Sequence, residues 1–563
     1  MYLSRLEIGN FRGIRSARMN FGETTVVIGE NDSGKTTLLD AICYILSPAH
    51  EDKGIYFMPH DFYMVMDQQA YRPAGQMRIN LTFRERKPDE WSNIRQNDFG
   101  LTLSDDTETL QELTLEVRAT PTADGGRSQA QWRIVAGKDQ TTGFSGDLSI
   151  LDWLRRLNPV FRIRGGIMND KEEEQADMGL QKEENGLPMP DDRIGEQIRS
   201  AFRNLISGRT PANKSELQAG YIAAMNYLES RSNLFNKDGL PLEEIIYEIL
   251  GKKEDAAMQD TRRIILRHGS AAEKIGLLLF TSAFLQSGGL MADVSAEPIF
   301  IIEDPEAHLH PMTLEAVKLL IDRLNWQKII TTQSGSLLSD FPLEDIRRIT
   351  RNEGNIREFW ARPGSLSREE LRRLSYHVRK RLNTATFARV WLLVEGESEM
   401  WLMPHLARLC GYDLTMEGIV CVEFAQCGIS PLIKAANQLG IDWFLMSDGD
   451  SAGKSYIETA RHFARELGKI PEEHCLRFTE RDIEHHLFFN GYQDIYSEYS
   501  GIPLPASQNV QPRRIIGRAI HRNSKPFMAI AVIEAIARPG SPGVPSELRK
   551  VVEACVKLAG GGR

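Results

Sequence analysis

The sequence TTVVIGENDSGKTTLLDAI, residues 24–42, places an apolar run, a glycine-containing loop and a helix-like segment in direct succession. The loop matches the pattern G-x-x-x-x-G-K-[ST] with Gly29, Gly34, Lys35 and Thr36. Its position between strand and helix is the one that a phosphate-binding loop requires. In such a loop, backbone N–H groups bind phosphate oxygens, the lysine neutralises them and the threonine hydroxyl ligates Mg²⁺. The stretch therefore predicts an ATP site in a P-loop α/β lobe.

The overall composition is that of a multidomain globular protein of 563 residues. No run approaches about 18 uninterrupted apolar residues, and the N-terminus lacks an apolar signal core, so we expect a cytoplasmic protein with no membrane partner. The six scattered cysteines include no C-x-x-C pair, which argues against a zinc ribbon and a disulfide framework. The net charge of −9 argues against a uniformly basic nucleic-acid binder but permits a local basic groove.

A second acidic element completes the expected ATPase. The apolar run from Ile299 to Ile302 is followed by Glu303 and Asp304. Phosphoryl transfer depends mainly on positioning and charge compensation. We therefore assign Glu303 to the Mg²⁺ shell and Asp304 to the attacking water.

Changes along the chain predict the domain order. An ATPase lobe with short strands is interrupted by an acidic, helix-like insertion and then resumes, and a charged linker leads to a regular alternation of strands and helices. The expected segments are the first ATPase part, 1–160; the helical insertion and dimerisation region, 161–260; the second ATPase part, 261–360; the linker, 361–388; and the parallel-sheet domain with its basic segment, 389–563.

Acidic residues gather at strand ends in the C-terminal domain: Glu395 and Glu399 in LLVEGESEM, and Asp448 and Asp450 in FLMSDGDSAGK. Ligands bind at the carboxyl ends of parallel strands, and carboxylates prefer Mg²⁺ or Mn²⁺ to zinc. Two such ions can activate a water and stabilise the leaving 3′ oxygen of a phosphodiester. Glu395, Asp448 and Asp450 are the expected central ligands, whereas Glu399 either binds the second ion or acts as general base.

A basic segment, QPRRIIGRAIHRNSKPFMA, lies near the C-terminus and contains no carboxylate. Its arginines either contact DNA phosphates or form a solvated helix face, and both interpretations stay open. The arginines assigned to DNA binding are Arg513, Arg514, Arg518 and Arg522.

The N-terminal motifs carry a family resemblance. NFRGI before the P-loop, the long separation between the two ATPase elements, and EDPEAHLHP followed by TTQSG resemble ABC-type ATPases of the SMC/RecF group, most closely the OLD (overcoming lysogenization defect) family. The resemblance implies composite sites, with a signature segment here read as RHGSAAEK. The nucleotide-binding residues so assigned are Arg12, Gly29, Asn31, Gly34, Lys35, Thr36, Thr37, Ser270, Glu303 and Gln333, of which Thr36 and Glu303 serve the metal.

The chain departs from the ABC pattern in three places. The signature lacks the usual second glycine, the acidic pair reads Glu-Asp, and Gln333 occupies the switch position that is often His. We therefore expect slow hydrolysis, because Asp304 is shorter than Glu and an amide cannot act as an imidazole does. His308 and His310 are expected to pack or hydrogen-bond rather than to bind metal.

The pattern E-G-x-x-E followed by D-x-D resembles the TOPRIM domain of topoisomerases, primases, recombination factors and OLD nucleases. The resemblance implies a further metal ligand at Glu484, in DIEHHLF, and a lysine near the scissile phosphate, here Lys525. The residues assigned to catalysis are Glu395, Glu399, Asp448, Asp450, Lys525 and Asp304. The expected metal ligands of this domain are Glu395, Glu399, Asp448, Asp450 and Glu484.

Taken over nearly the whole chain, the order resembles OLD-family ATP-dependent endonucleases. The resemblance implies a DNA nuclease in antiphage defence or DNA repair, a homodimer or higher homo-oligomer, and ATP with two Mg²⁺ or Mn²⁺ ions. Whether an unknown regulatory partner protein or RNA controls the activity stays open. A topoisomerase would need a tyrosine nucleophile in a separate domain, and a primase would need a template-binding module. A RecF-like ATP-dependent DNA clamp without nuclease activity is the alternative.

Overall fold

The computed structural model describes residues 1–46, 55–67, 70–87, 91, 110–122, 126–136, 148–158, 160–164, 297–307, 314, 318, 321, 326–381, 384–504 and 511–560. The predicted insertion beyond residue 164, the signature segment with Ser270, and both His308 and His310 lie outside the described residues. The chain divides into two compact units. The first comprises residues 1–27, 31–337 and 349–357, and the second comprises 28–30, 338–348 and 358–563.

A mixed sheet organises the ATPase lobe. Within the described residues it has 11 strands in the order β10-β8-β7-β1-β2-β15-β14-β3-β13-β12-β11. Strands β3, β13, β12 and β11 run parallel, whereas β10, β8, β7, β1 and β2 form an antiparallel wing. The strand bounds are β1 Tyr2–Phe11, β2 Ile14–Asn20, β3 Thr24–Ile28, β7 Met77–Arg84, β8 Glu112–Ala119, β10 Gln131–Ala136, β11 Val160–Arg164, β12 Ile299–Glu303, β13 Gln327–Thr331, β14 Ile346–Asn352 and β15 Asn355–Phe359.

The two halves of this sheet differ in sequence because they are buried differently. Strand β8 alternates half-buried and buried residues, as expected of an antiparallel strand with one covered face. Strand β12 is buried at every position, as expected of a parallel strand covered on both faces. The smaller elements are α1 Lys35–Leu46, β4 Tyr56–Phe57, β5 Met64–Asp67, β6 Ala70–Pro73, β9 Ser128–Gln129, α3 Leu148–Leu157 and α11 Gly335–Leu338.

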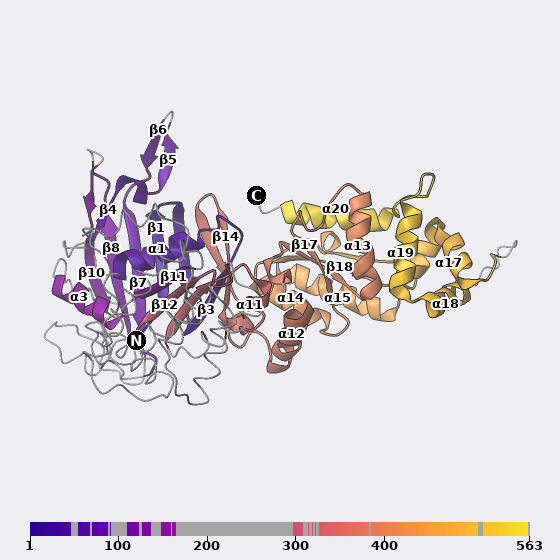
Figure 1. Cartoon of the computed structure of the whole chain (residues 1–563), viewed down its shortest axis with the longest axis horizontal. Helices are drawn as coiled ribbons and strands as arrows, with labels where there is room; N and C mark the ends of the chain where they lie inside the picture. The colour runs from indigo at the N-terminus through magenta and orange to yellow at the C-terminus, as the bar shows by residue number, and fades with distance from the viewer. Residues whose placement is uncertain are drawn as a thin grey trace, which may run out of the picture. The chain divides into compact units, whose positions relative to one another are not determined.

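The second unit contains the predicted parallel sheet, in the order β17-β16-β18-β19. Its central strand, VWLLV, is wholly buried. Helices α13 and α20 pack on one face of the sheet and α14 and α15 on the other (Figure 1). The bounds are β16 Val390–Val394, α13 Glu397–Leu409, β17 Ile419–Glu423, α14 Ile429–Gln438, β18 Asp442–Ser447, α15 Ser451–Glu466, β19 Cys475–Arg477 and α20 Ser546–Gly560. The predicted alternation of strands and helices is confirmed.

Further helices follow the sheet in the chain. Helices α17 and α18 pack together, and α19 packs on α13 (Figure 1). Their apolar side chains join the helices to the core of the parallel sheet. The bounds are α12 Arg368–Arg381, before the sheet, and α16 Ile483–Leu487, α17 Gln493–Ser500, α18 Pro512–Asn523 and α19 Lys525–Ile536, after it. In the part of the chain that the structure describes, no helix is both long and apolar enough to cross a membrane.

Candidate functional site

Two neighbouring strands bring three of the predicted acids to one edge of the parallel sheet. Glu395 directly follows β16, and Asp448 and Asp450 follow β18. The two strands pair in parallel, with Leu393 opposite Leu445, so their carboxyl ends meet. The backbone N–H of Asp448 donates a hydrogen bond to the Glu395 carboxylate. Sequence-distant acids therefore become neighbours at the edge where ligands bind.

Two further acids approach from helices. Glu399 lies in the first turns of α13 and Glu484 near the start of α16, and both are buried. Glu484 accepts a hydrogen bond from the Ser398 hydroxyl at 3.0 Å. The ammonium of Lys525, the first residue of α19, lies 3.4 Å from Glu484 Oε1. The structure thus places the expected lysine beside the expected carboxylates.

Crowding of these acids changes their protonation. Burial, together with the charges of Glu399 and Glu395, raises the pKa of Asp448 to about 8. Burial and then the charge of Glu484 raise the pKa of Glu399 to about 7. Burial also raises the pKa of Glu395. Repulsion among carboxylates and their desolvation at the edge of the sheet favour the binding of a cation or a proton.

The loop between the two aspartates requires glycine for space. A Cβ on Gly449 would lie 2.1 Å from the Glu480 carbonyl oxygen, and one on Gly453 would lie 1.9 Å from the Asp448 carbonyl oxygen. Asp450 caps α15 because its Oδ1 accepts a hydrogen bond of 2.8 Å from the Gly453 N–H. These contacts fix the D-G-D loop against its neighbours.

The donor set suits a hard divalent cation. Glu395 Oε2 and Asp448 Oδ1 are buried and have no hydrogen-bond partner, and buried acceptors are rarely left in that state. Carboxylate oxygens are the ligands that Mg²⁺ and Mn²⁺ prefer. Among the described residues, no group of three or more His, Cys, Asp or Glu side chains is already arranged to hold a metal ion. A cation would therefore have to draw the acids closer together.

The P-loop shows the geometry expected of a phosphate site. Lys35 begins α1, and Thr36 and Thr37 occupy its first turn. Gly34 has a φ of 96°, and a Cβ there would meet Ile356 Cδ1 at 2.7 Å, so glycine is required. The Ser33 hydroxyl is buried without a hydrogen-bond partner. A buried donor and a helix N-terminus fit the phosphates of a nucleotide.

The charge of Lys35 depends on nearby acids. Burial lowers the pKa of this lysine, whereas Asp304 and Asp32 act in the opposite direction. Asp304 itself follows β12 with a positive φ of 42°. Its N–H donates to the Thr331 carbonyl at 3.0 Å, which fixes the residue against β13. The structure thus brings Asp304 close enough to Lys35 for its charge to act on the lysine, and the assignment of Asp304 to the attacking water stays a prediction.

An ionic network around Glu303 was missed in the sequence. Arg162, on β11, forms an ion pair with the Glu303 carboxylate and donates to Asp40 Oδ1 at 2.5 Å. Arg12 binds the other oxygen of Asp40 at 2.5 Å and Asp61 at 2.9 Å. Arg12 is thus committed to carboxylates here, and its predicted nucleotide contact stays a prediction. Only the charged residues in the apolar strand VFRIR hinted at this network.

Glu306 fixes the switch segment, and this role was also missed in the sequence. Glu306 Oε1 accepts hydrogen bonds from the Thr332 hydroxyl at 2.8 Å, the Gln333 N–H at 2.7 Å and the Ser334 N–H at 3.1 Å. Gln333 is exposed. Glu306, the last residue of EDPE, therefore holds the backbone of the switch segment. Its position in this motif was the only signal in the sequence for that role.

The predicted DNA-binding arginines share helix α18. All four are exposed, and Arg522 donates to the Ser500 carbonyl at 3.0 Å. Within the described residues none of them pairs with a carboxylate. Helix α18 ends at Asn523, two residues before Lys525, so the arginines and the lysine of the acidic site lie on consecutive helices. The full set is Arg513, Arg514, Arg518 and Arg522.

The molecule is a P-loop ATPase lobe joined in one chain to a TOPRIM-type domain. A family model described as "Protein of unknown function (DUF2813)" matches residues 1–385. A model described as "Overcoming lysogenization defect protein-like, TOPRIM domain" matches residues 386–450. The chain therefore belongs to the DUF2813 family, and it is an OLD-type fusion of an ABC-like ATPase with a TOPRIM domain.

Two relatives of known sequence and one solved structure are similar to the chain over much of its length. The "Uncharacterized protein YbjD" of Escherichia coli (strain K12) is 32% identical over 575 residues, covering 100% of each chain. The "OLD nuclease" of Thermus scotoductus is 24% identical over 482 residues, covering 80% of this chain and 82% of its own. The Smc head domain of Pyrococcus furiosus, solved with the C-terminal domain of ScpA, is 17% identical with a TM-score of 0.34, covering 67% of this chain and 100% of that chain. The fold assignment rests on the sheet topologies and the family models.

Proposed function

We propose that the protein is a divalent-metal-dependent DNA endonuclease whose TOPRIM domain cleaves phosphodiesters and whose ATPase lobe binds ATP to regulate assembly or DNA access. The observation that carries the proposal is the gathering of five acids and Lys525 at the carboxyl edge of the parallel sheet. Two of these acids leave buried oxygens without partners. The relative named an OLD nuclease supports the same chemistry.

The acids would have different roles because their positions and protonation differ. Glu395, Asp448 and Asp450 follow two neighbouring parallel strands and would hold the ions, which when bound supply an activated water and compensate charge on the leaving oxygen. Glu399, with a pKa of about 7, is suited either to ligation or to accepting a proton. Lys525 carries its ammonium beside this cluster and would face a phosphate oxygen.

Glu484 orients the lysine. Burial lowers the pKa of Lys525, but the charge of Glu484 and their hydrogen bond outweigh it, and the net shift is upward. The lysine therefore stays cationic at neutral pH and acts as a charge rather than as a base. The arginines of α18 would contact the DNA backbone nearby.

The test is cleavage of supercoiled plasmid with Mg²⁺ or Mn²⁺, with and without ATP. Wild type should nick the plasmid, and Glu395→Ala should not. Glu397→Ala is the matched control because Glu397 is an exposed acid two residues away on α13. Lys35→Ala should alter the ATP dependence of nicking, because the variant lacks the phosphate-binding ammonium.

Two outcomes would contradict the proposal. Equal activity of Glu395→Ala and wild type would place the nuclease elsewhere or in a contaminant. DNA binding that responds to ATP, with no metal-dependent nicks under any condition, would support the clamp instead.

A further inference from the structure

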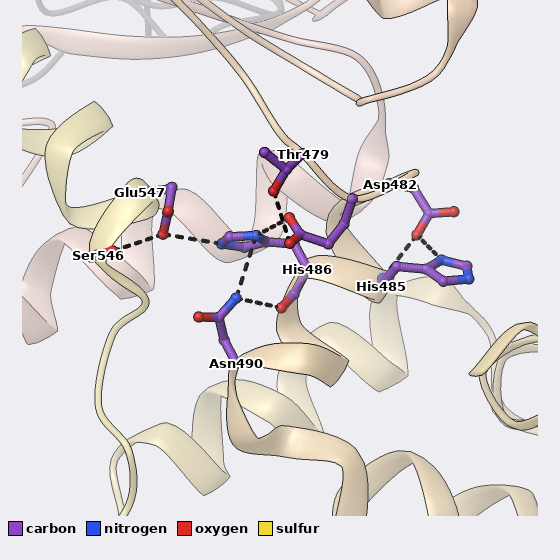
Figure 2. A network of polar contacts seen from close by, with 8 residues as sticks. Thr479, Asp482, His485, His486, Asn490, Ser546 and Glu547 are labelled. Atoms are coloured by element: carbon purple, nitrogen blue, oxygen red, sulfur yellow. Dashed lines mark hydrogen bonds and ion pairs between the residues drawn. The ribbon is translucent and has the colours of Figure 1, made fainter. Parts of the chain in front are cut away.

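A buried histidine lies outside the acids assigned to catalysis and yet is connected to them. His486, on α16, is 2% exposed, and its ring stacks on Phe478 with centroids 4.7 Å apart. Its Nδ1 lies 2.7 Å from Glu480 Oε2. A carboxylate can only accept, so Nδ1 carries the proton and donates to Glu480. Figure 2 shows His486 within a network of polar contacts that reaches Asn490 and Glu547.

Both carboxylate oxygens of Glu480 accept hydrogen bonds. Oε2 accepts from His486, and Oε1 accepts from the Thr479 hydroxyl at 2.9 Å. Asn490 donates to the His486 carbonyl at 2.8 Å, which fixes the helical turn that carries the ring (Figure 2). The side chain of Glu480 therefore has one position, and the backbone that carries it is fixed too.

The backbone of Glu480 and Arg481 packs against the D-G-D loop, residues 448–450. The Glu480 carbonyl accepts the Gly449 N–H at 3.0 Å, and the Arg481 carbonyl accepts the same N–H at 3.2 Å. Arg477 donates from its guanidinium to the Gly449 carbonyl at 3.1 Å. Both the N–H and the carbonyl of Gly449 are therefore hydrogen-bonded to the segment 477–481. Because Gly449 lies between Asp448 and Asp450, these hydrogen bonds set the directions in which both carboxylates point.

We propose that His486 is a positioning residue of the metal site: through Glu480 it fixes the segment 477–482 that clamps Gly449 and so places Asp448 and Asp450 for the cation. This inference rests on the proposed function for its metal site. Groups that orient metal ligands without touching the metal typically contribute about 10- to 100-fold in metal affinity or activity. His486 should contribute on that scale although it is neither a ligand nor a base.

The test compares His486→Asn with His486→Gln in the full chain. An asparagine amide falls near the place of Nδ1 and can still donate to Glu480, whereas a glutamine amide falls near the place of Nε2 and cannot. Both variants are polar and similar in size, so they differ mainly in this one hydrogen bond. Glu547→Gln is the control, because Glu547 lies 3.9 Å from Nε2, on the other side of the ring (Figure 2).

Two readouts are measured: Mn²⁺ binding by calorimetry without DNA, and the Mn²⁺ concentration that gives half-maximal plasmid nicking. We expect His486→Gln to weaken both about 10-fold or more, with nicking restored by excess Mn²⁺. His486→Asn and Glu547→Gln should stay within about 3-fold of wild type, a small part of the range that such groups cover. A Glu480→Ala substitution should add little to His486→Gln, since both act through the same contact.

Other outcomes separate this inference from the nuclease proposal. Equal weakening in His486→Asn and His486→Gln, or no weakening in either, overturns the positioning role. Mn²⁺ binding that follows the expected order in a wild type that never nicks DNA keeps the positioning role and overturns the nuclease. A wild type that binds no Mn²⁺ overturns both.

Discussion

Replacing Glu399 with glutamine should stabilise the metal-free protein. Glu399 is 5% exposed and lies among other acids. Its pKa rises from 4.5 to about 7 on folding, chiefly through burial and then through the charge of Glu484. At about 1.36 kcal/mol per pKa unit, a shift of this size corresponds to at most about 3 kcal/mol. Glutamine keeps the shape of the side chain and removes the charge.

The sign of the pH dependence follows from the raised pKa. A group whose pKa is higher in the folded state contributes stability that is present below its unfolded pKa of 4.5 and lost as pH rises through about 7. The variant lacks this titration. Its advantage over wild type should therefore be below about 1 kcal/mol at pH 5 and about 1 to 3 kcal/mol at pH 8.

The assay is urea unfolding in EDTA at pH 5 and pH 8, followed by fluorescence of Trp391 and Trp443, which are buried in the TOPRIM-type unit. Glu397→Gln is the matched control, since this exposed neighbour on α13 should change the free energy of unfolding by less than about 0.5 kcal/mol. With Mn²⁺ present the order should reverse, because wild type binds the ion and gains stability. A variant that is less stable than wild type at pH 8 in EDTA, or a control that gains as much, would refute the reasoning.

Three further predictions concern charge at the two sites. Lys525→Met should reduce plasmid nicking about 100-fold or more, as loss of a charge-stabilising donor does. The thermal midpoint should change little because the side chain is 57% exposed. Unchanged nicking would contradict the role of Lys525. Arg162→Ala should lower the free energy of unfolding by on the order of 3 kcal/mol in urea, because it removes the guanidinium that lies between the Glu303 and Asp40 carboxylates. A loss no larger than that of Arg133→Ala, whose ion pair with Glu116 is more exposed, would count against this. Mn²⁺ binding at pH 7 should release protons, since the pKa of Asp448 is about 8 without metal; binding heats that do not depend on the buffer's ionisation enthalpy would exclude this.

Local patterns were sufficient for much of the molecule. The P-loop was recognised because Gly29, Gly34, Lys35 and Thr36 occur at fixed spacing in one short stretch that is flanked by strand and helix. The parallel sheet was recognised because VWLLV and WFLM are uninterrupted apolar runs of strand length, and acids follow shortly after each. The acids at strand ends could be assigned to one edge because parallel strands place their carboxyl ends together.

Contacts between distant residues could not be found in this way. Arg162 and Glu303 are 141 positions apart, and Ser398 and Glu484 are 86 positions apart. Nothing in the local sequence fixes which charged side chain of a strand faces a given acid. The role of Glu306 at the switch depends likewise on how the chain returns after β12.

The sequence by itself determined the types of chemistry, because nucleotide loops and paired acids need particular residues at short, fixed spacing. The tertiary structure alone decided how those groups are tuned. It places the buried Glu399 beside the half-buried Asp448, which raises the pKa of both, and it packs the Glu480 carbonyl against Gly449, which fixes the loop between two acids. Burial and charge proximity depend on distances between side chains, and only the folded chain sets those distances.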